Sequence, residues 1–410
     1  MNIKFRLIIM NFLQYAVWGA WLISLGAYLG GRLEFSGQQI GSFFATMGIA
    51  SLFMPAIMGI IADRWIPAQK LLGISHLISA ALMIAAAPQT EYIPLYSLIL
   101  LSVMFYMPTI SLSNSVAYNA LSKAGLDTVK AFPPIRVWGT VGFIVAMIGV
   151  DLLGFTQSPM QLYTSACISI LLGVYAFTLP ECPVNKVAKN QSWVDTMGLR
   201  AFTLFKQKKM AIFFVFSMLL GVSLQITNAF GNDYLTNYFG SMEIYKGTFG
   251  VEHANILISL SQISETLCIL LIPFFLRRFG IKNVMLISMF AWVLRFGLLG
   301  TGNPGSGVWM LILSMLVYGV AFDFFNISGS LYVDKETDPS IRSSAQGVFM
   351  IMTNGFGAFI GSYAAGVVVD KFGWPASWFV FAGYAFVVTI LFAVIFKYKH
   401  NPQEEVKVTH

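Results

Sequence analysis

The chain contains twelve apolar runs, each long enough to cross a lipid bilayer. A helix needs roughly 20 residues to span the hydrocarbon core, and lipid-exposed backbone must satisfy its own hydrogen bonds. We therefore predict an all-α membrane protein with twelve transmembrane helices. The predicted spans are residues 6–31, 38–62, 71–88, 93–121, 134–154, 160–179, 210–240, 253–276, 283–301, 307–333, 343–369 and 375–397.

The composition excludes a soluble protein. Hydrophobic residues make up 57% of the 410 residues and charged residues only 10%, whereas a soluble domain is about 25% charged. Because the basic residues lie in short loops between apolar runs, they indicate topology and not a nucleic-acid partner. The four histidines and three cysteines show no metal-ligand or disulfide spacing, so we expect no metal and no cofactor.

The distribution of positive charge predicts the orientation. Of the 25 lysines and arginines, three (Arg32, Lys246 and Lys371) fall on one side and two (Arg136 and Arg295) within spans. The remaining 20 share the side that holds both chain ends. The positive-inside rule then places both termini of this multi-pass protein in the cytoplasm.

A long basic connection divides the spans six and six. We predict an N-terminal six-helix bundle over 1–180, a cytoplasmic linker over 181–209, a C-terminal six-helix bundle over 210–400 and a cytoplasmic tail over 401–410. Transporters built from parallel repeats have this arrangement, and their solute site lies near mid-membrane between the halves. Nothing in the sequence demands an oligomer, and we expect a functional monomer.

One carboxylate, Asp323, lies in the middle of the span 307–333. Burying a charged side chain there costs about 2.5–3.5 kcal/mol on insertion scales, so an acid at this depth usually has a function. Tyr318, Phe322 and Phe325 follow at i, i+4 and i+7, which forms an aromatic stripe on the same helix. The segment predicts a proton-sensitive acid beside a site for a flat, uncharged solute.

Polar residues also line one face of the span 134–154. Arg136, Thr140 and Phe143 follow at i, i+4 and i+7 and combine a cation, a hydroxyl and a ring. An arginine within a span normally pairs with an acid or lines a water-filled cavity. Because Arg136 lies near the cytoplasmic end, snorkelling to the interface is the alternative.

Two further spans carry amides and an acid. Gln225, Asn228 and Asn232 form an amide stripe that suits either a neutral solute or interhelical packing. Gln262 and Glu265 share a face of the next span. Glu265 is interpreted as an acceptor for solute hydroxyls or as a partner of Arg136, with a structural pair to Arg295 as the alternative. Polar and aromatic residues in the first span (Asn11, Gln14, Tyr15 and Trp18) are assigned to packing.

The loop after the second span resembles the signature of the major facilitator superfamily. Gly59, Asp63, Arg64 and Lys70 agree with its Gly-x-x-x-Asp-Arg pattern, whereas residues 65–68 depart from it. We therefore interpret Asp63 and Arg64 as a gating loop. The alternative is a solvated charge pair at a helix end, which contributes little energy.

The chain as a whole, from Asn11 to Lys399, resembles the bacterial nucleoside:proton symporters of that superfamily. The similarity is carried by FPPIRVWGTVGF (132–143), SMLLGVSLQITNAFGN (217–232), SQISET (261–266), YGVAFDFFNISGS (318–330) and AQGVFMIMTNGFG (345–357). The resemblance implies a two-bundle fold in a bacterial cytoplasmic (inner) membrane and proton coupling through Asp323. We include Glu265, the second carboxylate within a span, as a further proton-coupling candidate. It implies solute contacts at Arg136, Thr140, Phe143, Gln225, Asn228, Gln262, Glu265, Tyr318 and Phe322.

The expected function is therefore import of nucleosides, purine or pyrimidine, driven by inward proton flow through alternating access. A sugar:proton symporter and a multidrug proton antiporter have the same architecture and remain alternatives. An enzyme is not expected, because the spans contain no nucleophile–base pair and no metal set.

Overall fold

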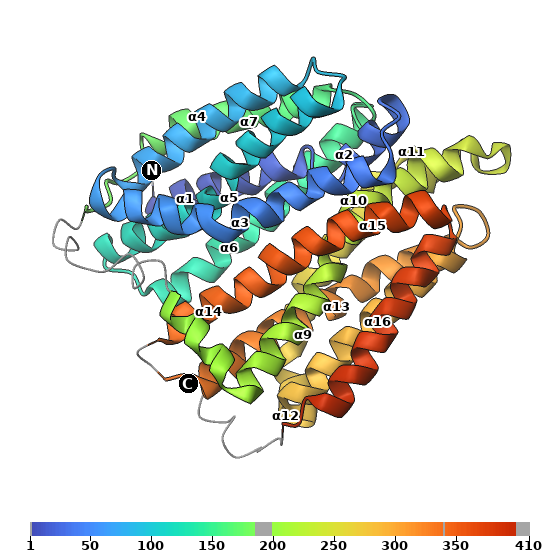
Figure 1. The fold of residues 1–410 in the computed structure, drawn as a ribbon. Coiled ribbons are helices and arrows are strands. Elements are labelled where there is room, and N and C mark those ends of the chain that lie inside the picture. The colour runs from blue at the N-terminus through green and yellow to red at the C-terminus, as the bar shows by residue number, and fades with distance from the viewer. Residues whose placement is uncertain (1, 185–198, 339–340, 399–410) are drawn as a thin grey trace. The chain divides into compact units, whose positions relative to one another are not determined.

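The computed structural model describes residues 2–184, 199–338 and 341–398 (Figure 1). The predicted tail over 401–410 and the middle of the predicted linker lie outside these residues. The chain folds into two compact units, Met1–Met197 with Asn228–Asp233, and Gly198–Thr227 with Tyr234–His410. The proposed division into bundles at 1–180 and 210–400 stays a prediction.

The first unit is built entirely of helices in its described part. Long helices alternate with short turns, and the first segment continues after a break into two short helical pieces. The elements are α1 (Ile3–Gly19), α2 (Leu25–Ala27), the π-helix η1 (Tyr28–Arg32), α3 (Gly37–Arg64), α4 (Ala68–Ala86), α5 (Tyr92–Lys123), α6 (Thr128–Leu152) and α7 (Met160–Ala176).

The second unit is also helical throughout its described residues. It begins with η3 (Leu199–Lys206) and α9 (Lys208–Leu224); α10 (Ile226–Asp233) follows, mostly grouped with the first unit. Short helices η4 (Tyr234–Tyr238), η5 (Phe239–Ser241), η6 (Glu243–Tyr245) and α11 (Phe249–Glu252) precede the long ones. These are α12 (Ala254–Thr301), α13 (Val308–Glu336), α14 (Arg342–Met350), η7 (Ile351–Gly357), α15 (Ala358–Phe372) and α16 (Ala376–Ile395).

The twelve predicted spans are all present as helical segments. Within the described residues, nine helices are long and apolar enough to cross a membrane. One of them, α12, contains two spans that meet at Gly280, whose φ of 73° lies in the left-handed region that glycine adopts without strain. The shorter α7 and the interrupted first segment supply the remaining two. The predicted all-α fold class is confirmed.

Three spans are interrupted where a continuous helix was expected. The first ends its regular α-helix at Gly19, the span over 210–240 breaks at Gln225, and the span over 343–369 contains the π-helical stretch Ile351–Gly357. The helix α6 also begins at Thr128, well before the expected start at residue 134. Hydropathy measures only side-chain polarity, so it does not register a change in backbone hydrogen bonding.

Glycines bring helix backbones into direct contact inside the first unit. A Cβ atom at Gly142 of α6 would clash with the carbonyl oxygen of Phe12, and one at Gly19 would clash with that of Phe143. The absence of side chains at these positions therefore lets α1 and α6 pack closely, as small residues commonly do between membrane helices. This contact fixes the face of α6 that carries the predicted solute residues.

A second set of close approaches fixes the helices of the second unit. In α13, Gly319 lies directly against the backbone of Ser264 in α12, where a Cβ would clash. The amide of Gly319 donates to Ser264 Oγ at 3.3 Å, and that hydroxyl donates to the carbonyl of Leu316. Because of these contacts, the segment around Asp323 has a fixed register against the segment around Glu265.

A buried polar network joins four helices of the first unit. His76 Nδ1 lies 2.9 Å from Ser169 Oγ of α7, and its Nε2 lies 2.9 Å from Gln14 Oε1 of α1. Gln14 Nε2 donates to Thr109 Oγ1 of α5 at 2.7 Å, and Tyr106 donates its hydroxyl proton to the Gln14 carbonyl at 2.8 Å. Both ring nitrogens are satisfied, so His76 serves packing within this unit, as predicted for Gln14.

Candidate functional site

In the first unit, the predicted solute residues lie on the face of α6 that meets α1. The Arg136 guanidinium lies over the ring of Tyr15, with Cζ 3.9 Å from the ring centroid. Phe143 is 8% exposed and lies edge-on to Trp18, with centroids 6.3 Å apart. Arg136 and Thr140 are half-buried. On this face, the Arg136 cation therefore lies against the Tyr15 ring and Phe143 lies against Trp18.

Tyr15 and Trp18 were expected to serve packing alone, but in the structure they contact Arg136 and Phe143. Tyr15 supplies the ring beneath the Arg136 guanidinium, and the buried Trp18 Nε1 donates no hydrogen bond among the described residues. A buried N–H without an acceptor is costly and uncommon. The i, i+3 spacing of Tyr15 and Trp18 was the sequence signal that they share one face of the first span.

In the second unit, α13 holds two stacked rings. Tyr318 and Phe322 lie with centroids 5.5 Å apart and ring planes 13° from parallel. Tyr318 is only 5% exposed, whereas Phe322 is half-buried. Phe325 does not continue the stripe: it is fully buried and packs against Phe213 and Phe349. Phe322 is therefore the more accessible ring of the stacked pair.

Asp323 follows Phe322 in α13, and its carboxyl group is buried. The residue is 5% exposed, and its Oδ2 makes no hydrogen bond in the described part of the chain. Glu265 of α12 lies close enough to interact electrostatically with both Asp323 and Tyr318. A nearby like charge and a membrane interior both disfavour the charged form of a carboxyl group. The pair suits proton uptake and release.

The predicted amides lie on α12 and around the break between α9 and α10. Gln262 is half-buried one helical turn before Glu265 on α12. Gln225 lies at the break between α9 and α10, and Asn228 follows in α10. The expected amide stripe is therefore interrupted by a change in helix geometry between Gln225 and Asn228. Asn232 is fully buried.

The alternative pairing of Glu265 with Arg295 is not observed among the ion pairs of the described residues. Arg295 makes hydrogen bonds to Ser261 and Ser314 and lies over the Tyr318 ring, but it forms no ion pair with any described residue. Spacing along α12 did not reveal that an aromatic face of α13 meets this cation. Asp63 and Arg64, at the end of α3, form no ion pair with described residues either.

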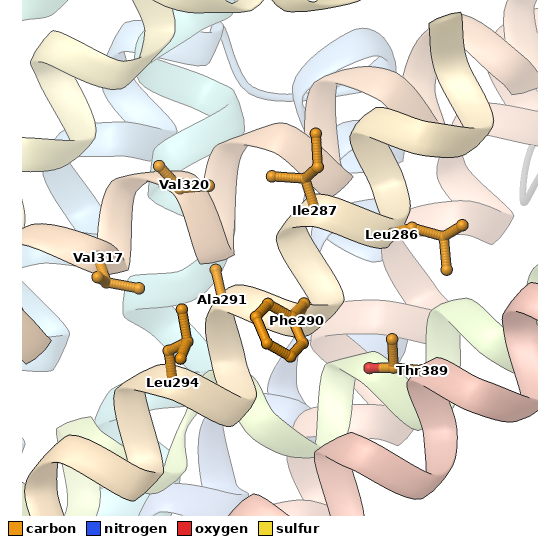
Figure 2. A pocket seen from close by; sticks show the side chains of 8 residues that line it. All are labelled: Leu286, Ile287, Phe290, Ala291, Leu294, Val317, Val320 and Thr389. Carbon is orange, nitrogen blue, oxygen red and sulfur yellow. The ribbon is translucent and has the colours of Figure 1, made fainter. Parts of the chain in front are cut away.

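A groove elsewhere in the second unit has a different character. It encloses about 500 Å³, and Figure 2 shows eight residues around it, among them Phe290 and Leu294 of α12, Val317 and Val320 of α13, and Thr389 of α16. Thr389, its single polar lining residue, donates its hydroxyl proton to the Ala385 carbonyl at 2.7 Å. The groove suits hydrocarbon rather than a hydroxyl-rich solute.

Among described residues no group of three or more His, Cys, Asp or Glu could hold a metal.

The comparison with known proteins decides the family. Residues 1–401 match the family model described as "Nucleoside H+ symporter". The chain belongs to the nucleoside H+ symporter family. It is a transporter and not an enzyme, and the predicted resemblance is confirmed.

Relatives and solved structures agree with this assignment. The chain is 51% identical to the nucleoside permease NupG of Escherichia coli (strain K12) over 407 residues, covering 98% of this chain and 97% of that one. It is 50% identical to the xanthosine permease of Escherichia coli (strain K12) over 420 residues, covering all of both chains. A crystal structure of NupG superposes with a TM-score of 0.92 at 51% identity, over 97% of this chain and 100% of that one.

More distant structures show the fold alone. A crystal structure of a D-xylose-proton symporter matches with a TM-score of 0.69 at 14% identity, over 98% of both chains. Together these neighbours identify the major facilitator superfamily fold. The chain is thus a multi-pass membrane protein of this superfamily, homologous to Escherichia coli permeases.

Proposed function

We propose that this protein imports nucleosides together with protons across a bacterial cytoplasmic membrane. The observation that carries the proposal is the stacked pair Tyr318–Phe322 next to the buried Asp323, whose Oδ2 accepts no hydrogen bond from the described residues. Flat rings recognise a nucleobase by stacking, and a buried acid carries a proton. Membership of the nucleoside H+ symporter family supports both halves of the proposal.

The remaining site residues fit the chemistry of a nucleoside. Phe322 and Phe143 offer rings for the base, and Tyr318 supports Phe322 by stacking. Gln225, Asn228 and Gln262 offer both a donor and an acceptor for the edges of the base or the sugar. We assign Glu265 to the ribose hydroxyls, because hydrogen bonds to a charged acceptor contribute about 1.5–3 kcal/mol each. Arg136 and Thr140 contribute donors from α6.

We assign proton coupling to Asp323, with Glu265 as the interacting second acid. In this cycle Asp323 takes up a proton from the outside, nucleoside binds, the transporter changes to its inward-open state, and both are released. The membrane potential provides about 2.3 kcal/mol per charge for each 100 mV. That energy suffices to concentrate a neutral solute roughly fifty-fold per proton at 100 mV.

The orientation and the loop after α3 complete the proposal. Both termini face the cytoplasm, Asp63 and Arg64 take part in gating, and one chain suffices for transport. Single cysteines placed at Arg278 and at Lys246, in a chain without its own cysteines, test the orientation. An impermeant thiol reagent applied to intact cells should label only the second, and labelling of the first would reverse the topology.

A nucleoside panel tests the proposed substrate class. Purified protein in proteoliposomes, with the outside made acidic, should accumulate labelled uridine and should be inhibited by unlabelled nucleosides but not by xylose, sucrose or maltose. Xanthosine belongs in the panel, because the chain is about as similar to a xanthosine permease as to NupG. Competition by sugars and not by nucleosides would favour a sugar symporter. Proton-driven efflux of a drug would indicate an antiporter.

A further inference from the structure

A buried arginine lies within α12 without an anionic partner. Arg295 is 2% exposed, and no Asp or Glu of the described chain lies within ion-pair distance of its guanidinium. A charged side chain inside a membrane span is costly, and it normally pairs or faces a cavity. Since Arg295 forms no ion pair with a described residue, its charge must be stabilised by other groups.

Three groups of the second unit surround the guanidinium. Arg295 Nη1 donates to the Ser314 carbonyl at 2.7 Å and to Ser261 Oγ at 3.4 Å, and Ser314 Oγ donates back to the Arg295 carbonyl at 3.0 Å. The guanidinium also lies over the face of Tyr318, whose ring centroid is 4.5 Å from Cζ. The Nε atom donates no hydrogen bond to any residue that the structure describes. The Tyr318 ring is thus a principal source of negative electrostatic potential for this cation.

Tyr318 links the arginine to Phe322, the other ring of the stacked pair that we propose for solute binding. Its ring contacts the guanidinium, stacks on Phe322 at 5.5 Å, and meets Trp292 edge-on at 6.0 Å with planes at 90°. Because Tyr318 is held by Arg295 and Trp292, the orientation of the half-buried Phe322 ring depends on them as well. A cation–π contact is strongest when it is desolvated, as it is here.

We propose that Arg295 is a positioning residue for nucleoside binding: it fixes the Tyr318 ring and, through stacking, the Phe322 ring that receives the nucleobase. The inference rests on the proposed function of the Tyr318–Phe322 pair. Arginine suits this role better than lysine, because its planar guanidinium stacks on rings and is weakly hydrated. Arg295 itself does not touch the solute, since it is almost completely buried.

Transport kinetics of three variants test the inference. R295M removes the cation and keeps an apolar stem, R295K keeps the charge but loses the planar group, and R277M removes an exposed cation from the same helix. Uptake of labelled uridine is measured in proteoliposomes, with the maximal rate normalised to folded protein. R295M should raise KM on the order of tenfold with the maximal rate retained, R295K should raise it less, and R277M should leave it unchanged.

Two outcomes separate this inference from the proposed function. If Y318A raises KM while every folded Arg295 variant keeps the wild-type KM, Arg295 has no positioning role and the inference is overturned. If Y318A and F322A both leave KM unchanged, the proposed site itself is wrong. If Arg295 had a purely structural role, substituting it would lower only the amount of folded protein and would leave KM unchanged. The double variant R295M/Y318A should be no worse in KM than Y318A alone, because both changes remove the same contact.

Discussion

In each unit an arginine within a membrane span lies over a tyrosine ring. Arg136 lies 3.9 Å from the Tyr15 centroid and is half-buried, whereas Arg295 lies 4.5 Å from that of Tyr318 and is buried. Because their exposures differ, we propose different roles for them. We propose that Arg136 keeps donors available for a solute, and that Arg295 holds the Tyr318–Phe322 pair in position from within the second unit.

The exposed donors of Arg136 lead to a prediction about affinity. R136M should raise KM for uridine by roughly ten- to a hundredfold, since a hydrogen bond to a charged group contributes about 1.5–3 kcal/mol. The KM of R136K should lie between those of the wild type and R136M. Uptake kinetics in proteoliposomes measure the effect, with R277M as the exposed control. A wild-type KM for R136M would assign Arg136 to snorkelling instead.

Residue spacing predicted which side chains share a face of one helix, but not which residues of other helices they contact. The i, i+4 spacing predicted that Tyr318 and Phe322 share a helix face, and in the structure their rings lie stacked on that face. Phe325 and Arg295 differ from expectation because their partners belong to other segments of the chain. The role of Tyr15 was missed for the same reason: its partner lies on α6.

Pairs of helices hold the candidate residues in place, and glycines decide how closely they approach. A Cβ at Gly142 would meet the Phe12 carbonyl, whereas one at Gly149, also in α6, would meet nothing within 4 Å. We predict that G142A separates α1 from α6 and lowers both thermal stability and uridine uptake. G149A is the matched control and should behave as wild type. Equal melting temperatures for G142A and G149A would contradict the close packing.

The His76 network leads to a second prediction about the first unit. H76A leaves Gln14 Oε1 without its partner and should destabilise the protein by about 1–3 kcal/mol, the cost of an unsatisfied buried polar group. Thermal unfolding in detergent measures it. Ser97 donates only to Ile93 within its own exposed helical turn, so S97A serves as control. KM should remain unchanged in H76A; a changed KM with an unchanged melting temperature would place His76 in the solute site.

The helical elements themselves were predictable, and their interruptions were not. Apolar length located every span, and glycine at position 280 allowed the turn within α12. The break at Gln225 and the π-helix Ile351–Gly357 arise from backbone hydrogen bonding, which composition does not encode. The amide stripe expected from an ideal helix was therefore only partly correct.

For the whole molecule, the bilayer is the dominant constraint, because it requires helical spans of fixed length. The twelve spans and the transporter class follow from that constraint together with the family resemblance. Solute accumulation is a property of the complete chain, since it requires binding, a proton-carrying acid and a change of access. The central claim is that Asp323 couples these events.

Uridine accumulation by wild type and D323N tests this claim most directly. Proteoliposomes with an acidic outside and a negative inside should show wild-type uridine rising above the external concentration. D323N cannot carry the proton, so it should reach only the external concentration, while it still exchanges internal for external uridine. The control E91Q alters an exposed carboxylate and should accumulate normally. Accumulation by D323N to the wild-type level would contradict the account.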